Sequence, residues 1–408
     1  MTPYIIEWIN LILRFTHVVT GIAWIGASFY FMWLDNHLQT PPQWKQDKGI
    51  KGDLWSIHGG GFYEVAKYKH GPEQMPEILH WFKWEAYSTW LSGFLLLCVM
   101  YYLGAETYLI DPQVAELSQT QAIAIGLLTI FGGLFVYELL CKSKLGQYPI
   151  VLSVLLILLV TLLAYGLSQL FSARGMYIHI GALIGTIMAA NVFLVIMPSQ
   201  RALVSAVTEG TTPDPSWGAK AKLRSTHNTY TVLPLLFIMI SNHYPMTYNH
   251  QYGWLVLVCL FIITALVRWY FVLKHTQKPS VLIPIVVVIM TLSLAYLMSD
   301  RSQPKAPASN DEQVSEGTVK LEEVKIEQAQ VETIVAKHCA NCHSATPTDK
   351  VFVVAPVGVI LDDYDSMLRW RSRIYARAVA SNGMPLLNKT NMTQDERNIL
   401  GLWVKQQK

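Results

Sequence analysis

The chain has 408 residues, of which 52% are hydrophobic and only 14% are charged, against about 25% charged residues in an ordinary soluble domain. Its net charge of +3 is small and no basic stripe of recognition length occurs, which excludes a nucleic-acid partner. Most of the chain must therefore lie in a lipid bilayer.

Eight apolar runs predict eight transmembrane helices, because each approaches the ~20 residues that cross a hydrocarbon core. The first run lacks a basic flank and a small-residue cleavage site, so we expect it to remain in the mature protein. The sequence thus predicts an all-α protein in which residues 1–299 form an eight-helix transmembrane bundle. The runs lie near residues 5–34, 85–104, 120–141, 148–171, 175–197, 223–244, 252–273 and 281–299.

The loops predict the orientation of these helices. Lys and Arg gather in the odd-numbered loops, whereas the intervening loops are nearly free of them. By the positive-inside rule the odd loops are cytoplasmic, so both termini are periplasmic in a bacterial inner membrane. The basic residues are Lys45, Lys48, Lys51, Lys67, Lys69, Lys142, Lys144, Arg201, Lys220, Lys222, Arg224, Lys274 and Lys278.

The second predicted span begins with a group of polar and aromatic residues. His80, Lys83 and Glu85 stand among Trp81 and Trp84. Polar residues at membrane depth are functional candidates, here the first three as catalytic and the tryptophans as substrate-binding residues. The "HGGG" stretch of the preceding loop adds a place where backbone approaches a ligand closely. An ordinary interfacial belt of Trp and Lys explains the group about as well.

A second group lies on the sixth predicted span. His227 and His243 are about 24 Å apart along a helix, one near each face of the bilayer. Tyr230 shares a helix face with His227, while Asn228 and Asn242 flank the two histidines. All five are catalytic candidates, although a single membrane histidine is more often a packing residue.

Further histidines predict a cluster at the periplasmic side. His17 on the first span and His179 on the fifth could meet His243, and a histidine pair from facing helices can hold a b-type haem or a relay. Recognition of a substrate by hydrogen bonds explains the pattern nearly as well. Arg14, on the same face as His17, either pairs with an anion or extends toward water.

The fifth span also carries a close-packing face. Gly181, Gly185 and Ala189 repeat every four residues. Such a face packs against a neighbouring helix of the chain or forms a homodimer. The three cysteines of the apolar region, Cys98, Cys141 and Cys259, resemble small core residues and imply no disulfide framework.

The composition changes after the last apolar run. Residues 300–325 are polar and rich in proline, serine and acids, which predicts a flexible periplasmic linker. The spacing Cys339-x-x-Cys342-His343 in residues 326–408 then predicts a separate domain of the class I cytochrome c type. Thr393 and Glu396 predict a capping box that opens its final helix, and Trp403 should pack into this domain.

The C-terminal domain contains the motif Cys339-x-x-Cys342-His343. Its spacing lets both thiols bond one covalent haem c while His343 ligates the iron. Met384 is the candidate for the second axial ligand, which would raise the potential and suit an electron acceptor. A zinc site is the competing interpretation, but it needs two more ligands nearby.

Several long stretches carry a resemblance. "GIAWIGASFYFMWLDNHL", "GGGFYEV", "LHWFKWEAYSTWLSGF" and "HNTYTVLPLLFIMISNHYP", with the "CANCH" tail, resemble the bacterial membrane-bound cytochrome c urate oxidases, also called urate hydroxylases. The resemblance implies that urate and water form 5-hydroxyisourate, without hydrogen peroxide. Electrons would pass to the fused haem and on to a downstream cytochrome or terminal oxidase. The haem-binding pattern of the family corresponds to Cys339, Cys342, His343 and Met384.

The substrate site is an inference from the residues themselves. Urate is a planar anion, so Lys83 could hold its charge, a tryptophan could stack on it, Asn228 or Asn242 could bond its oxygens, and a His or Glu85 could take a proton. A site at Lys83 would lie across the membrane from the haem. Either a relay bridges that distance, or urate binds near His243 on the outer side.

Two rival functions belong to other classes. A non-enzymatic membrane electron carrier, which takes electrons from quinol or a partner subunit, fits the composition and topology equally. A transporter with a fused redox sensor fits less well, because internal repeats are lacking.

Overall fold

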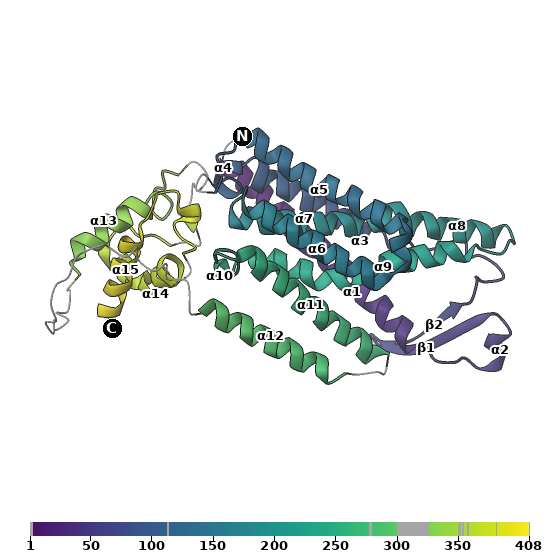
Figure 1. The fold of residues 1–408 in the computed structure, drawn as a ribbon. Helices are drawn as coiled ribbons and strands as arrows, with labels where there is room; N and C mark the ends of the chain where they lie inside the picture. Colours follow the sequence, from purple (N-terminus) through teal and green to yellow (C-terminus); the bar gives the residue numbers. More distant parts are fainter. Residues whose placement is uncertain are drawn as a thin grey trace.

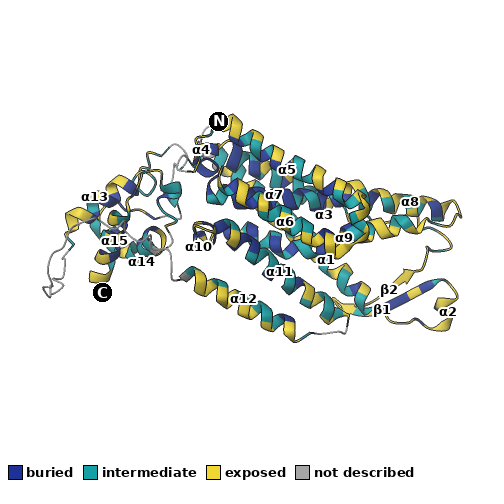
Figure 2. Ribbon diagram, viewed as in Figure 1, coloured by how far each residue is buried: buried dark blue, intermediate teal, exposed yellow. Residues whose placement is uncertain are grey.

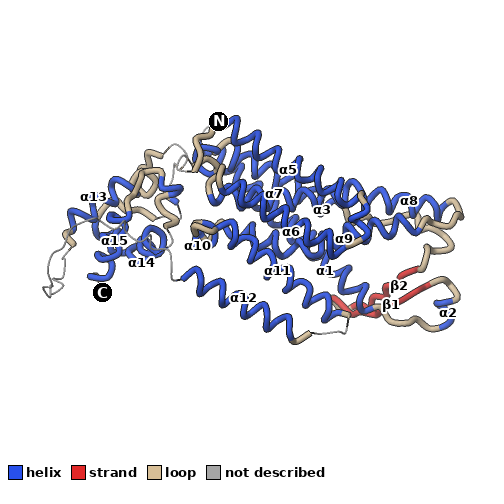
Figure 3. Tube along the Cα trace, viewed as in Figure 1, coloured by secondary structure: helices blue, strands red, loops and turns tan. Residues whose placement is uncertain are grey.

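The computed structural model describes residues 3–111, 114–276, 280–299, 326–349, 352, 355–356, 359–380 and 382–407. Most of these residues are helical (Figure 3). A bundle of long helices makes up the larger part, and a smaller C-terminal unit lies beyond one end of the bundle (Figure 1). The predicted linker over residues 300–325 lies outside the described residues.

Helices occupy all eight of the apolar runs. Within the described residues, five helical segments are long and apolar enough to cross a membrane: Trp8–His37, Gln119–Lys142, Pro149–Ser168, Ala173–Thr208 and Gly253–His275. The count of eight spans stays a prediction, since the others are shorter or carry more charge. The helices are α1 (Pro3–His37), α3 (Trp84–Leu97), α5 (Gln119–Lys142), α6 (Pro149–Ser168), α7 (Ala173–Ala190), α9 (Pro215–Ser241), α11 (Gly253–His275) and α12 (Leu282–Ser299).

Shorter elements complete the bundle. Helix α8 (Met197–Thr208) extends the line of α7, whereas α4 (Ala105–Tyr108) and α10 (Pro245–Tyr248) lie at the end that faces the C-terminal unit (Figure 1). The remaining short elements are α2 (Gln43–Gln46), the 3₁₀ helix η2 (Lys144–Gln147) and the π-helical segments η1 (Cys98–Tyr102) and η3 (Asn191–Ile196).

The bundle is built around a core of large apolar side chains. Tyr177, Ile180, Ile130 and Leu257 are fully buried between α5, α7 and α11. The outer helices, in contrast, expose apolar side chains, as the pattern on α12 illustrates (Figure 2). An apolar outer surface is what a helix presents to lipid.

The glycines of α7 face another helix of the same chain. A Cβ atom on Gly181 would lie 2.7 Å from Cγ2 of Ile238, and one on Gly185 would lie 3.7 Å from Cδ2 of Leu235, both on α9. This face therefore packs α7 against α9. The homodimer through Gly181 and Gly185 stays a prediction, and both glycines also line the cavity described below.

A two-stranded antiparallel hairpin corrects the expectation of an all-α chain. Strands β1 (Ile50–His58) and β2 (Gly61–Tyr68) project from the end of the bundle opposite the C-terminal unit (Figure 1). Gly59 and Gly60 form the two-residue turn with φ of 57° and 81°, angles that glycine adopts readily. Nothing lies within 4 Å of where their Cβ atoms would be, so these glycines serve the turn, and the close approach of a ligand to this run stays a prediction.

The C-terminal unit has its own hydrophobic core. It contains α13 (Gln328–His338), α14 (Tyr364–Ile374), the π-helical η5 (Tyr375–Ala380), the 3₁₀ turn η6 (Leu386–Asn388) and α15 (Gln394–Gln406). Trp403 is fully buried, and its Nε1 donates a hydrogen bond to the Tyr364 hydroxyl at 3.0 Å. The capping box between Thr393 and Glu396 is confirmed.

Candidate functional site

A cavity of about 470 Å³ lies inside the bundle, between α1, α3, α7 and α9. Its lining is mostly apolar, and four aromatic side chains, Trp24, Trp90, Phe94 and Tyr101, contribute to it. A largely apolar cavity with a few convergent polar groups is typical of a small-molecule site. The polar lining includes Arg14, His17, Arg174, Asn228, Asn242 and His243.

Arg174 provides a fixed positive charge at one end of this cavity. Its Nε donates to Oδ1 of Asn242 at 2.8 Å and to the hydroxyl of Tyr101 at 3.0 Å. Its guanidinium carbon also lies 5.0 Å from the ring centroid of Tyr108. These partners are neutral, and no carboxylate within the described part of the chain pairs with Arg174. The charge is held in place and is left for an anion.

His17 is oriented by the neighbouring helix α3. Its Nδ1 lies 3.0 Å from the carbonyl oxygen of Thr89 and 3.3 Å from Oγ of Ser92. Because a carbonyl oxygen only accepts, Nδ1 carries the proton in the neutral ring and Nε2 can accept one. The ring fits against Gly93, where a Cβ would lie 2.7 Å from Cε1 of His17.

Asn228 connects the far end of the cavity to a buried polar network. The Oδ1 of Asn228 accepts a hydrogen bond from Nδ2 of Asn191 at 2.8 Å. Asn191 also bonds the hydroxyl of Tyr137, which lies 2.7 Å from Nδ1 of His227. His227 is thus part of this network and does not line the cavity.

The same network contains a buried ion pair. Arg224 lies 2.9 Å from Oε1 of Glu138 and donates to its Oε2 at 3.1 Å. Its NH1 also donates to Oδ1 of Asn191. Arg224 is therefore neutralised within the fold, unlike Arg174.

His179 has both ring nitrogens engaged. Nδ1 lies 2.8 Å from the carbonyl oxygen of Gly175, and Nε2 lies 3.4 Å from the Tyr102 hydroxyl. The ring is fully buried against Gly126 and does not line the cavity. It does not join His17 and His243, which share the cavity.

The group at the start of α3 lies outside the cavity. His80 is exposed, Trp84 is 66% exposed, and Trp81 packs against a small separate core. Lys83 is the N-cap residue of α3, and one carboxylate oxygen of Glu85 is buried without a hydrogen-bond partner. None of the five lines the cavity, and their catalytic or substrate-binding roles stay predictions.

Tyr230, on α9, also lies apart from the cavity lining. Five of the polar residues predicted from the sequence line the cavity: Arg14, His17, Asn228, Asn242 and His243. Arg174 and Tyr101 were missed in the sequence. The sequence did contain a signal for Arg174. The predicted spans 148–171 and 175–197 place it in a short loop on the side of the membrane whose loops otherwise lack Lys and Arg.

The histidine of the C-terminal motif is held through one ring nitrogen. Nδ1 of His343 lies 3.0 Å from the carbonyl oxygen of Val359, which leaves Nε2 for a metal. Burial raises the pKa of Cys339 to about 12 and that of Cys342 to about 11. No group of three His, Cys, Asp or Glu side chains able to hold a metal occurs in the described residues, so a zinc site lacks its further ligands there.

Met384 lies in a segment that Arg397 holds in place. Arg397 donates to the carbonyl oxygens of Met384, at 2.7 Å, and Ala378, and to Oδ1 of Asn388 at 3.1 Å. The Met384 side chain packs on the same core as Cys339. Both ends of the candidate haem site therefore belong to one packed unit.

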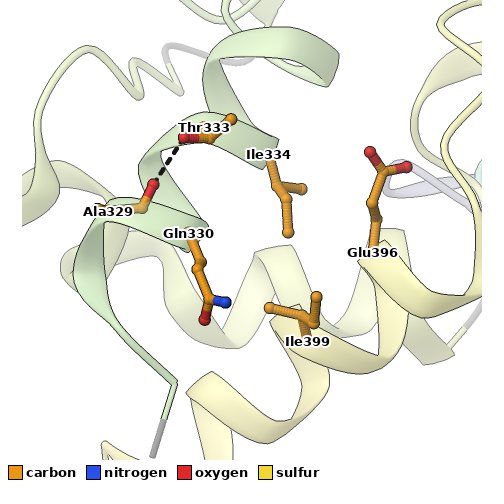
Figure 4. Close-up of a pocket in the computed structure, with 6 residues that line it drawn as sticks. All are labelled: Ala329, Gln330, Thr333, Ile334, Glu396 and Ile399. Atoms are coloured by element: carbon orange, nitrogen blue, oxygen red, sulfur yellow. Dashed lines mark hydrogen bonds between the residues drawn. The ribbon is translucent and has the colours of Figure 1, made fainter.

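A second hollow lies on the surface of this unit, between α13 and α15 (Figure 4). Ala329, Thr333 and Ile334 face Glu396 and Ile399 across it, and Thr333 donates a hydrogen bond to the carbonyl oxygen of Ala329 at 2.7 Å. It is shallow and contains none of the candidate residues. We assign it no function.

The family model "Urate oxidase N-terminal" matches residues 3–299, which is well over half of the chain. The chain belongs to the urate oxidase N-terminal family. The match covers the whole bundle with its cavity and ends before the C-terminal unit. No curated protein and no solved structure matched the sequence. Family membership relates the chain to urate oxidation and assigns none of its residues.

Proposed function

We propose that the protein is a membrane-bound urate oxidase that hydroxylates urate to 5-hydroxyisourate and passes the electrons to a fused haem c. The family match supports urate as the substrate. The observation that carries the site is Arg174, a half-buried cation held by neutral partners beside a cavity with aromatic walls. We place urate in this cavity.

The cavity supplies what a planar anion needs. Arg174 offers charge-assisted hydrogen bonds, and Asn228 and Asn242 offer amide groups for the urate oxygens. Trp24 and Trp90 provide apolar aromatic faces. These groups come from α1, α3, α7 and α9, so the packing of the four helices brings them together in one site.

His17 is our candidate for the base. Urate gains an oxygen from water and gives up two electrons and two protons, so a group must accept protons as the C–O bond forms. Neutral His17 has its Nδ1 occupied by Thr89, and Nε2 is free to take a proton from water or substrate. Ser92 and Gly93 keep the ring in this orientation.

The C-terminal unit would hold the electron acceptor. Cys339 and Cys342 would bond haem c covalently, with His343 and Met384 as axial ligands. The residues fit this group, because His343 is already oriented through Nδ1 and Met384 packs with Cys339 on one core. Haem c supplies one-electron acceptance, so the two electrons leave in successive steps to a downstream cytochrome or terminal oxidase. This unit would be periplasmic, and the bundle would span a bacterial inner membrane.

The same cavity suggests a second candidate occupant. His17, on α1, and His243, in the turn after α9, both line it, and a ligand pair for a b-type haem comes from separate segments in this way. His179 does not fit this role because both of its nitrogens are engaged. A pyridine haemochrome spectrum distinguishes the two occupants. A haem b signal would indicate that haem occupies the cavity, whereas haem c alone would favour urate.

The visible spectrum of the purified protein, recorded without oxygen before and after urate is added, tests the proposal. We expect a sharp reduced c-type band, loss of urate, and no hydrogen peroxide after aeration. If the haem stays oxidised with urate but is reduced by a quinol, the protein is an electron carrier. Movement of urate across vesicles without haem reduction would instead indicate a transporter.

A further inference from the structure

The C-terminal unit contacts the bundle at a defined surface. Nζ of Lys389 donates a hydrogen bond to Oγ1 of Thr107 on α4 at 3.0 Å. Nδ2 of Asn249, after α10, donates to the carbonyl oxygen of Asn382 at 3.2 Å. Leu386 packs against the hydrophobic core of the bundle. Polar and apolar contacts thus hold the same face of the unit.

This face is the one that contains Met384. The contacting residues Asn382, Leu386 and Lys389 lie on both sides of Met384 in the chain. Phe352, from the segment after the Cys-x-x-Cys-His motif, also packs on the bundle core, and its ring centroid lies 6.5 Å from that of Tyr108. The candidate haem site is therefore turned toward α4.

Aromatic side chains continue from this surface to the cavity. The ring centroid of Tyr108 lies 6.0 Å from that of Tyr101, which lines the cavity. The guanidinium of Arg174 lies 5.0 Å from the Tyr108 centroid and 5.9 Å from the Tyr101 centroid. Tyr101, Tyr108 and Phe352 form a continuous line of rings between the two units.

We propose that α4 is the docking site for the haem-bearing face of the C-terminal unit, and that Tyr108, with Tyr101, is the contact through which electrons leave the cavity. The electron-transfer part rests on the proposed function. Each of the two electrons from urate passes singly across these rings to the ferric haem, and the two protons stay on the cavity side with His17 or water. The rings act as a bridge and are not themselves oxidised.

A cross-link tests the docking without any turnover. In a Thr107→Asp variant, a carbodiimide should join the introduced carboxylate to Lys389 as an amide, detected as a peptide pair by mass spectrometry. The matched control adds Lys389→Arg, which keeps the charge but cannot form the amide. The pair should appear in the first variant alone. A Thr107→Asp protein without it, or with its carboxylate joined to other lysines instead, would overturn the docking.

Substitution of Tyr108 tests the route. Tyr108→Leu removes the ring, and we expect the rate constant of haem reduction by urate to fall about tenfold or more, as for other small misplacements at reacting centres. Tyr108→Phe keeps the ring and should stay within about twofold of the parent protein. Haem reduction by ascorbate and the midpoint potential should be the same in all three. Equal urate-driven rates in the Leu and Phe variants would overturn the route.

The two tests separate the inference from the proposed function. If the cross-link forms but urate never reduces the haem, the docking holds while the urate proposal and the electron route both fail. If urate reduces the haem normally in the Tyr108→Leu variant, the enzyme proposal holds and the route fails.

Discussion

Arg174, which is half-buried, and Arg224, which is buried, lie in the same bundle, and the partners of their charges differ. Arg224 faces the carboxylate of Glu138 and belongs to a network that satisfies its charge. Arg174 faces a tyrosine hydroxyl, an amide oxygen and a cavity. A buried charge needs a partner, so the first arginine stabilises the fold and the second is prepared for an anion that arrives from outside.

Removal of Arg224 should have the largest effect on stability. Arg224→Met leaves the largely buried Glu138 carboxylate with only the exposed Lys142, whose Nζ lies 3.4 Å away, and we expect the free energy of unfolding to fall by up to about 3–5 kcal/mol. Denaturant titration in detergent micelles measures this. The double variant Arg224→Met, Glu138→Leu should recover most of the loss, because no charge is then left unpaired. A single variant as stable as the parent would contradict a structural role for Arg224.

Removal of Arg174 should lower activity toward urate and leave the stability of the fold nearly unchanged. Arg174→Met leaves Tyr101 and Asn242 able to bond each other, since Tyr101 already donates to Asn242 Oδ1 at 3.2 Å. We expect kcat/KM for urate to fall about 100-fold, a loss of ~2.7 kcal/mol of transition-state stabilisation. Arg174→Lys should fall less, because it keeps the charge and loses the fork. A loss of stability like that of Arg224→Met would remove the contrast between the two arginines.

Gly93 and Gly126 provide a matched test of His17, which lines the cavity, and His179, which does not. A Cβ on Gly93 would lie 2.7 Å from Cε1 of His17, and one on Gly126 would lie 2.5 Å from Nε2 of His179. Each Gly→Ala change should therefore destabilise the protein by about 1–3 kcal/mol through overpacking.

Only the Gly93→Ala variant should also lose activity toward urate, by about tenfold, because it displaces the histidine that lines the cavity. Gly126→Ala moves a histidine with both nitrogens engaged and should leave kcat/KM near the parent value. Equal activity losses in steady-state assays of the two variants would show that His17 has no special role.

The smallest effect is expected at an exposed ion pair. The hydrogen bond from Lys337 holds the pKa of Glu396 below its ordinary value, so the pair adds stability above the unfolded-state pKa and loses it as the pH falls below that value. The free energy of unfolding of the C-terminal unit, followed by near-ultraviolet circular dichroism of Trp403, should fall by at most ~1 kcal/mol from about pH 5 to pH 3. Glu396→Gln should flatten this dependence, and a variant that keeps the parent's slope would assign it to other groups.

The sequence predicted what depends on local pattern. Helices occupy the apolar runs within a few residues, and the cap at Thr393 is present because spacing alone specifies such features. The hairpin was missed because its strands do not alternate regularly between buried and exposed residues. It also covers a charged side chain, Lys45, which forms ion pairs with Asp53 and Glu64. The network around Arg224 joins three distant segments, and no spacing in the chain reveals it.

The candidate site was predicted in part for the same reason. Arg14, His17, Asn228, Asn242 and His243 were recognised as polar residues in apolar runs, and all line one cavity. Polarity could not distinguish them from His179 or His227, whose hydrogen bonds are satisfied by partners far along the chain.

Three π-helical turns lie beside the residues discussed above. Tyr101 belongs to η1 and Asn191 to η3, and η5 provides carbonyl oxygens that bond Arg397 and the Met384 backbone. A π turn arises when one extra residue enters a helix. Deletion of one residue of this turn, such as Val99, would therefore restore a regular α-helix, while the helix on each side keeps nearly its present orientation because the π turn already absorbs the extra residue. The widened turn that carries Tyr101 to the cavity would be lost, so this part of the lining depends on one residue of η1.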